Sequence, residues 1–401
     1  METYDLVIIG AGVAGAFATY KITTENPNLK IAVIDIGRPP LKRRRQLEGW
    51  FGCLPNSDGK FYNTDYNNVA SLVGNEVAEK SNKYLNDIFS STFEYKKTRV
   101  KKPSKDFYKK VNQLGYSVKE HGYFQIYPKD VHSVSKKMNK YIEDHMNLHY
   151  YFDQEVLSID KINSNFVIKT DLAEIEANKI LLSVGRSGWR FAQQIYSKFD
   201  IIVDNSIANY GVKCEIGEGS CTEFNKSVCD LKKDSVNIGK FLWGGSVIQE
   251  DHIDLSISSF RSNEQRWKSE KVSFDIIKTV NNPNGIEESE RLSKLVFLLA
   301  NDRVLKEKAS LFLEDKSKIS ILKEFSWLKE VFLDLNKIIN DFTDKANVYY
   351  PTMITTPCKI NIKQNLETDV DGMYVAGECS GNQGLLYSAL TGIAFTECFN
   401  K

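Results

Sequence analysis

Residues 4–36 read YDLVIIGAGVAGAFATYKITTENPNLKIAVIDI, the most informative segment of the sequence for the fold. Residues 4–9 are apolar and predict a strand, residues 14–22 suit a helix, and residues 30–36 are again typical of a strand. Two strands joined in this way by a helix form a βαβ unit, in which the strands lie parallel. The sequence therefore predicts an α/β fold that is organised around a parallel sheet.

The turn between the first strand and the helix has the spacing Gly-x-Gly-x-x-Gly, from Gly10 through Gly12 to Gly15. The first glycine permits the tight turn, the second lets a pyrophosphate approach the backbone, and the third allows helix and strand to pack closely. Backbone N–H groups at the helix start, around Val13 and Ala14, have no partner within the helix and suit a diphosphate. We expect these five residues to bind a dinucleotide.

Asp35 ends the second strand, about twenty positions after the last glycine of the turn. A carboxylate at this place can accept hydrogen bonds from both hydroxyls of the adenosine ribose, and it would repel a 2′-phosphate. Two alternatives stay open at this point. The turn could be structural, or the dinucleotide could be NAD and not FAD.

Two later segments favour FAD: residues 180–186 read ILLSVGR and residues 373–378 read MYVAGE, so each is a strand that ends in glycine. A simple NAD domain needs neither. With the N-terminal unit they resemble the glutathione-reductase-like FAD-binding superfamily, whose late strand-Gly-Asp motif holds the ribityl chain, with Glu378 here in place of the aspartate. The resemblance implies that Gly185, Arg186, Gly377 and Glu378 contact FAD.

A closer resemblance covers under half of the chain. Residues 49–53 (GWFGC), 57–60 (SDGK), 184–188 (VGRSG), 210–213 (YGVK) and 377–381 (GECSG) look like a family of uncharacterised FAD-dependent dehydrogenases. Phe51 and Cys53 stand where that family is richer in glycine and alanine. No second glycine fingerprint occurs mid-chain, so we expect an external electron donor or acceptor.

Lys60 is the predicted catalytic residue, because a cation near the flavin ring could stabilise developing negative charge or orient a substrate. Ser57, Asp58 and Gly59 before it are predicted to contact the cofactor, although Asn-Ser-Asp-Gly is also an ordinary turn sequence. Further along, the free N–H groups of a helix that starts at Gly384 and Leu385 would face the pyrimidine edge of the flavin.

The remaining candidate residues have weaker sequence support. Arg43 and Arg44 could reach the phosphates, and Val156 is placed at the cofactor. Cys53 has no second cysteine close in sequence and is expected to be an inert thiol. His145 and His149 have the spacing of a metal pair, but they fall where a helix gives way to a strand, so we predict no metal site.

These segments predict a Rossmann-like three-layer FAD-binding domain with a central parallel sheet and an inserted α+β cap domain that selects the substrate. The FAD-binding domain is expected to be discontinuous, over residues 1–66, 121–213 and 348–401, and the cap to comprise residues 67–120 and 214–347. Apolar positions at helical spacing, 292–299 and 325–339, predict amphipathic helices in the cap.

Composition narrows the class of protein: 42% of residues are hydrophobic and 26% are charged, which suits a globular enzyme. Fifty-three basic residues against 52 acidic ones give a net charge of +1, so no global field attracts nucleic acid or lipid. Seven cysteines without a Cys-x-x-Cys pair, and no long apolar segment, lead us to expect a soluble protein of a reducing cytoplasm.

The predicted function is an FAD-dependent oxidoreductase that transfers a hydride between a small organic substrate and flavin N5. One alternative is a flavin-dependent tRNA or DNA modification factor, because residues 95–110 combine basic and aromatic side chains. Another is a protein that holds FAD without turning over a substrate.

Overall fold

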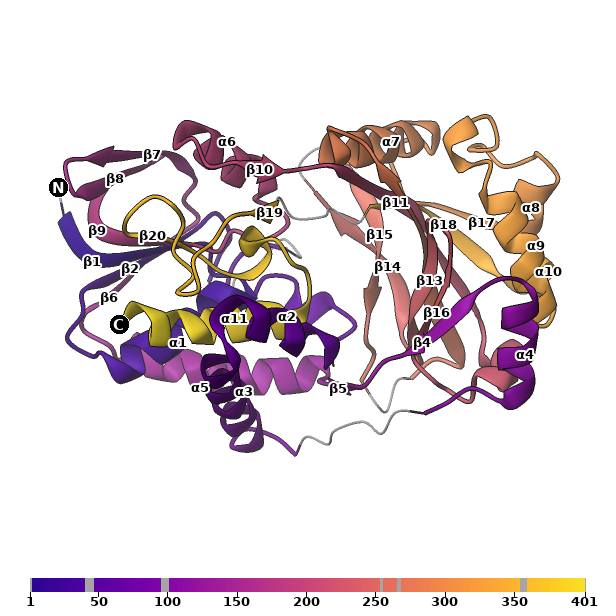
Figure 1. Ribbon diagram of the computed structural model, residues 1–401, viewed down its shortest axis with the longest axis horizontal. Coiled ribbons are helices and arrows are strands. Elements are labelled where there is room, and N and C mark those ends of the chain that lie inside the picture. Colours follow the sequence, from indigo (N-terminus) through magenta and orange to yellow (C-terminus); the bar gives the residue numbers. More distant parts are fainter. Residues whose placement is uncertain are drawn as a thin grey trace.

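The computed structural model describes residues 2–39, 47–94, 101–252, 255–264, 268–353 and 359–400. The chain forms an elongated body in which two β-sheets lie end to end, each with its own helices (Figure 1). Both ends of the chain lie beside the first sheet (Figure 1). The polypeptide therefore leaves this half of the molecule and returns to it.

The first sheet has a parallel centre. Its order is β6-β2-β1-β9, and β20 pairs in parallel with the C-terminal half of β9. The N-terminal half of β9 continues into an antiparallel meander with β8 and β7. The bounds are β1 (Glu2–Ile9), β2 (Ile31–Asp35), β6 (Leu148–Phe152), β7 (Val156–Ile162), β8 (Asn165–Thr170), β9 (Glu174–Leu182) and β20 (Met373–Val375).

Both faces of this sheet are covered. In β1, Leu6 and Ile8 join one hydrophobic core, whereas Val7 and Ile9 join another on the opposite face. Strands that are buried on both faces are typical of a parallel sheet between layers of helices. The first core takes in α1 (Val13–Glu25), α2 (Thr64–Val73), α3 (Asn75–Ser90), α5 (Pro128–Glu143) and α11 (Leu385–Phe399), and the second takes in α6 (Trp189–Lys198).

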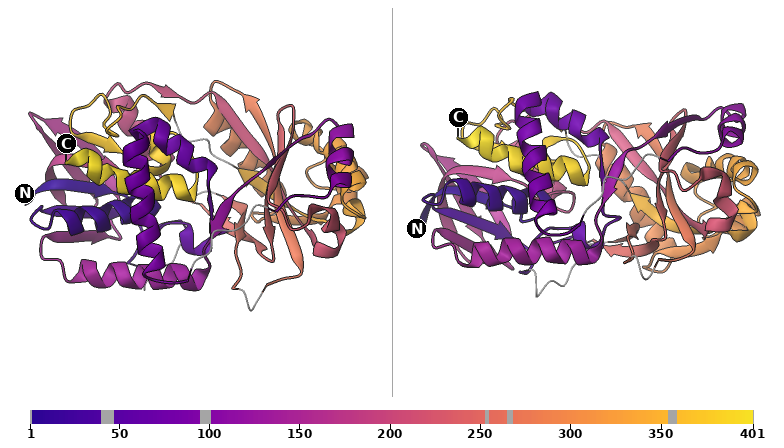
Figure 2. Two further views of the ribbon diagram at one scale, coloured as in Figure 1. Left: turned by 60° about the horizontal axis from the view of Figure 1, so that its bottom comes forward. Right: turned by 90° about the horizontal axis from the view of Figure 1, so that it is seen from below.

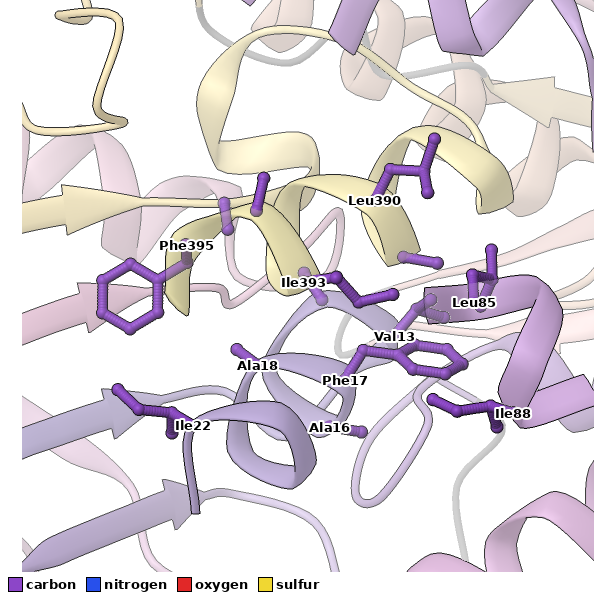
Figure 3. Close-up of a cluster of buried hydrophobic side chains, with 14 of the residues drawn as sticks. Val13, Ala16, Phe17, Ala18, Ile22, Leu85, Ile88, Leu390, Ile393 and Phe395 are labelled. Atoms are coloured by element: carbon purple, nitrogen blue, oxygen red, sulfur yellow. The ribbon is translucent and has the colours of Figure 1, made fainter. Parts of the chain in front are cut away.

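Helices α1 and α11 pack against each other at the centre of the first layer (Figure 3). Phe17 of α1 and Ile393 of α11 are fully buried there, together with Leu85 of α3. Both helices are apolar on most of their circumference, which is expected of helices buried inside a protein. This packing holds the start of α1 and the start of α11 close to the same edge of the sheet.

The second sheet is antiparallel, with the order β17-β18-β11-β16-β13-β12-β4. A separate hairpin of β14 and β15 lies on its side toward the first sheet (Figure 1). The bounds are β4 (Ser117–Glu120), β11 (Ile207–Gly217), β12 (Cys229–Lys233), β13 (Val236–Trp243), β14 (Ser246–Asp251), β15 (Ser256–Arg261), β16 (Lys271–Asn281), β17 (Leu305–Lys308) and β18 (Asn347–Met353).

Helices cover the outer side of the second sheet, as the rotated views also show (Figure 2). They are α4 (Lys105–Gln113), α7 (Gly285–Leu299), α8 (Ala309–Leu313), α9 (Leu328–Ile338) and α10 (Phe342–Lys345). The remaining short elements are β3 (Lys60–Tyr62), β5 (Tyr123–Gln125), β10 (Val203–Asp204), β19 (Lys359–Ile360) and the 3₁₀ turns Leu54–Asn56, Glu218–Phe224, Lys323–Phe325 and Gly377–Ser380.

The predicted fold class is confirmed: a Rossmann-like sheet lies between helices and carries an inserted α+β unit. The boundaries differ from those predicted. Residues 67–90, expected in the cap, form most of α2 and all of α3 and pack on the first sheet, because Val77, Leu85 and Phe89 make one apolar face. Residues 207–213 and 348–353, expected in the FAD-binding domain, belong to β11 and β18 of the second sheet.

Across the part of the chain that the structure describes, every helix is too short or too polar to cross a lipid bilayer.

Candidate functional site

A cavity of about 750 Å³ lies between the two halves of the molecule. It begins at the carboxyl ends of β1, β2 and β9, passes the start of α11, and ends on the second sheet and the β14–β15 hairpin. Ligands of open α/β sheets bind at this edge, and the volume lies within the range of small-molecule and cofactor sites. All of the predicted site residues that the structure describes line this cavity, except Gly15 and Gly59.

The glycine turn forms one end of the cavity. Gly10 has a φ of +97°, and a Cβ atom there would lie 2.6 Å from the Ser183 carbonyl oxygen, so only glycine fits. A Cβ on Gly15 would lie 1.9 Å from the Gly10 carbonyl oxygen, which explains why Gly15 packs behind the turn and does not line the cavity.

Gly12 is different, because the protein itself leaves room beside it. A Cβ atom on Gly12 would meet no heavy atom closer than the Ser183 carbonyl oxygen, at 3.9 Å, and the residue lines the cavity. Gly12 also precedes α1, whose first turn has no side-chain cap. The free N–H groups of that turn, around Val13 and Ala14, therefore remain available to an anionic ligand in the cavity.

Asp35 lines the cavity and also holds the turn together. Its Oδ2 accepts a hydrogen bond from the Ala11 N–H (2.6 Å), and its Oδ1 accepts from the N–H groups of Gly37 (2.7 Å) and Gly49 (2.8 Å). Burial raises the pKa of this carboxyl, and the three backbone hydrogen bonds oppose that shift. A carboxylate offers about four acceptor sites, so Oδ2 can still accept from a ribose hydroxyl.

Residues 49–53 form a strap over the glycine turn. The Phe51 N–H donates to the Ala11 carbonyl at 2.9 Å, and a Cβ atom on Gly52 would approach the Gly12 Cα within 3.2 Å. Phe51 has a φ of +65°, a conformation that glycine adopts more easily, and its ring is 1% exposed and packs edge-on against Phe17. The buried ring offsets the cost of that backbone conformation.

The end of β9 carries a charged group at the middle of the cavity. Arg186 interacts with Glu250 of β14 and with Glu378 after β20. Burial opposes ionisation of Glu250, but Arg186 and His252, whose Nε2 lies 3.1 Å from the Glu250 carboxylate, hold its pKa at about 2. Burial raises the pKa of Glu378, against the pull of Arg186. Arg186 and Glu378, which the sequence analysis named, line the cavity together with Glu250, which it did not name and which comes from the second half.

The start of α11 holds a carboxyl group that sequence reasoning missed. Gly384 has a φ of +131°, and a Cβ atom there would lie 2.2 Å from Asp65 Oδ2. Asp65 is 9% exposed and accepts a hydrogen bond from the Tyr387 N–H of the first turn of α11. Burial raises the pKa of Asp65 to about 7, despite that hydrogen bond. Asp65 falls in the first turn of α2, where acidic residues are common, so no sequence signal distinguishes it.

Lys60 joins the two halves. It is 2% exposed, its ammonium donates a hydrogen bond to the Phe241 carbonyl of β13, and it lies 5.1 Å from the centre of the Tyr123 ring. Burial lowers the pKa of Lys60 to about 8. Ser57 and Asp58 line the cavity beside it. Gly59 packs closely against the backbone of Ile126, because a Cβ atom on Gly59 would lie 2.0 Å from the Ile126 carbonyl oxygen.

Four further predictions concern the two arginines, Cys53 and the histidine pair. Arg43 and Arg44 lie outside the described residues. Cys53 forms no disulfide, as is true of every described cysteine, and its thiol faces Arg186. His149 lies on β6 and hydrogen-bonds through Nδ1 to the Tyr4 hydroxyl at 2.7 Å. Among the described residues, no group of three or more His, Cys, Asp and Glu side chains is arranged to hold a metal ion.

The basic and aromatic stretch 95–110 is described only from residue 101. Within it Phe107 is completely buried against Phe224, and Lys110 pairs with Glu223 at 2.6 Å. Tyr108 donates a hydrogen bond to Glu120. A buried ring cannot stack on a nucleobase, so Phe107 serves the packing of α4, while Lys101, Lys102, Lys105 and Lys109 are exposed.

No protein-family model matches the sequence, and no curated protein matches it. Among solved structures, the chain is similar to a quinol-fumarate reductase with menaquinol molecules, with a TM-score of 0.50 and 14% identity over 99% of this chain and 70% of that one. It is also similar to the halogenase PltM, with a TM-score of 0.49 and 11% identity over 98% of this chain and 68% of that one. A third similar structure is glycine oxidase from Geobacillus kaustophilus, with a TM-score of 0.46 and 11% identity over 100% of this chain and 95% of that one. The likeness to the reductase shows that this chain shares its fold.

Proposed function

We propose that this protein is an FAD-dependent oxidoreductase that acts on a small organic substrate. The observation that carries the proposal is the continuity of the cavity: it joins the glycine turn, the end of β20 at Gly377 and Glu378, the start of α11 and the second sheet. A nucleotide turn by itself would need only the first of these parts. An extended dinucleotide with a reactive ring at its far end uses all of them.

The residues present fit FAD along this path. The open side of Gly12 and the free amides of α1 suit the pyrophosphate, and Asp35 suits the adenosine ribose. Glu378, buried at the middle of the cavity with one oxygen that lacks a hydrogen-bond partner in the described structure, suits the ribityl hydroxyls. When bound, FAD would supply hydride transfer at its N5 atom.

Lys60 is the catalytic residue in this proposal. Its ammonium is buried at the cavity wall, where the low local dielectric strengthens its interaction with negative charge on a bound ring or substrate. The N–H groups at the start of α11 act in the same direction, although Asp65 already uses one of them. The far end of the cavity, on the second sheet, is left for the substrate.

The first test is the release of FAD from the purified protein by heat, identified by chromatography. Anaerobic titration of the bound flavin with NADH, NADPH and a panel of small organic acids, alcohols and amines then identifies the reductant. Reduction by one of these, followed by exposure to oxygen, separates an oxidase from a dehydrogenase. Flavin that dithionite reduces and no biological reductant reduces would contradict the proposed activity and leave FAD in a non-catalytic role.

A further inference from the structure

Two lysines of the second sheet face the substrate end of the cavity and share one buried carboxylate. Lys213 of β11 lies directly across from Asp275 of β16 in the sheet, and Gly239 of β13 is the partner of Asp275 on its other side. Lys240 follows Gly239. The Nζ atoms of Lys213 and Lys240 lie 3.9 Å and 3.8 Å from Asp275 Oδ2.

Lys240 owes its position to an irregularity in β13. The pairing register with β16 shifts between Gly239 and Leu242, and Lys240 itself has a φ of +54°. Bulges of this kind re-aim a side chain, and a left-handed lysine is costly unless the surroundings maintain it. The strand is therefore distorted at the residue that brings the second ammonium to the cavity.

The hydrogen-bonding capacity of this group is not used within the described residues. Distances of 3.8 and 3.9 Å are too long for hydrogen bonds, and Asp275 Oδ2 has no hydrogen-bond partner there. Lys213 is 6% exposed and Asp275 is 1% exposed, so water contributes little at these two groups, whereas the Lys240 side chain is 44% exposed. Buried charges are normally hydrogen-bonded, so the Lys213 ammonium, which lines the cavity, has donors available to an anionic ligand there.

Other charged groups lie near the two lysines and Asp275. Lys60 adds a third ammonium close enough to interact with Asp275. Asp58 and Asp230 also interact with Asp275, but Asp230 pairs with His121 at 3.0 Å and Asp58 accepts from the Lys60 N–H at 3.1 Å. Glu250 also interacts with Lys213, and Glu378 with Lys240, so the two lysines lie among charges of both signs.

The surroundings of the lysines are apolar. The Phe260 ring lies under the Lys213 ammonium, 3.9 Å from its centre, and Leu255, Ile257 and Met353 form one small buried cluster beside it. These four residues line the cavity. A ligand that fits both parts has a carboxylate at one end and a compact apolar body at the other.

We propose that Lys213 and Lys240 bind the carboxylate of an organic-acid substrate, whose apolar body packs against Phe260, Ile257 and Met353. The inference rests on the proposed function, because it names the substrate class of that same site. Asp275 holds the two ammonium groups in place while the site is empty, and the substrate carboxylate then supplies the hydrogen bonds that Asp275 is too distant to make.

The pH dependence of binding follows from the burial of Lys213. Burial lowers its pKa to about 8, with Lys240 and Arg186 acting in the same direction and Asp275 and Glu250 opposing them. A neutral Lys213 binds a carboxylate less well than the ammonium form. Affinity for a carboxylate is therefore expected to fall as the pH rises through about 8, and affinity for its neutral amide is expected to stay constant.

The test is calorimetric titration of the purified holoprotein at about pH 6.5 with acetate, isovalerate and benzoate, each beside its amide. At least one carboxylate should bind about tenfold or more tightly than its amide. K213M should lower the affinity for that carboxylate about tenfold and leave the affinity for the amide unchanged. K278M, on the same sheet but facing Trp327, is the matched control and should behave as wild type.

The variant D275N separates binding from a structural role. Removing the competing carboxylate should tighten carboxylate binding several-fold, the opposite of the K213M effect. No preference for any of the three carboxylates, or equal weakening by K213M and D275N, would overturn the inference. The FAD content of each protein is measured in parallel: a chain without FAD refutes the proposed function, while the titration still decides the carboxylate site.

Discussion

At the start of α11, the carboxyl group of Asp65 lies where Gly384 has no side chain to exclude it. Its pKa of about 7 means that the folded protein binds more protons than the unfolded chain between about pH 4 and pH 7. The free energy of unfolding should therefore fall as the pH rises through this window. A shift of about three units corresponds to roughly 4 kcal/mol.

The variant D65N should remove most of this pH dependence, because an amide keeps the acceptor for the Tyr387 N–H and carries no charge. Urea unfolding between about pH 5 and pH 8 measures the effect. Wild type should lose more stability across the range than D65N, with D87N, an exposed position on α3, following wild type. Parallel curves for wild type and D65N would show that Asp65 ionises as it does in water.

At the scale of elements, the βαβ unit was predictable because its signals are local. The apolar runs, the glycine spacing and Asp35 lie within 36 residues, and β1, α1 and β2 form where they were expected. The packing of helices α2 and α3 on the first sheet was not predicted, because their apolar residues are sparse and their packing partner α11 lies some three hundred residues later. The cluster of Lys213, Lys240 and Asp275 exists only through the pairing of β11, β13 and β16, which no local pattern encodes.

The contact of α11 with α1 holds in place the two helix starts that line the cavity, so we expect mutations that weaken this contact to destabilise the fold. I393A removes a fully buried side chain from this contact (Figure 3) and should lower the free energy of unfolding by about 2–5 kcal/mol. L333A, at a side chain of α9 that is 53% exposed, should change it by less than about 0.5 kcal/mol. Denaturant unfolding measures the free energy of unfolding of both variants. An equal loss in I393A and L333A would show that the α1–α11 contact contributes no more than an exposed position.

At the scale of the whole molecule, the site lies between two halves that each have their own core. The first half presents backbone amides and glycines, and its residues were largely predictable because they follow a recurrent pattern. The second half supplies Glu250, Lys213 and Lys240, which set the chemistry of the far end of the cavity. With a net charge of +1 the molecule has no strong overall field, so the charge of the cavity is set locally by such residues.

FAD binding by the variant G12A tests whether the glycine turn holds the cofactor. The protein leaves room for the added methyl group, and the backbone of Gly12 has a φ of −62°, so the variant should fold and unfold like wild type. Gly217→Ala, at an equally open position with a φ of −60° in the second sheet, is the control. We predict close to one FAD per chain in wild type and G217A and almost none in G12A. Equal FAD content in G12A and wild type, or none in wild type supplied with FAD, would contradict the account.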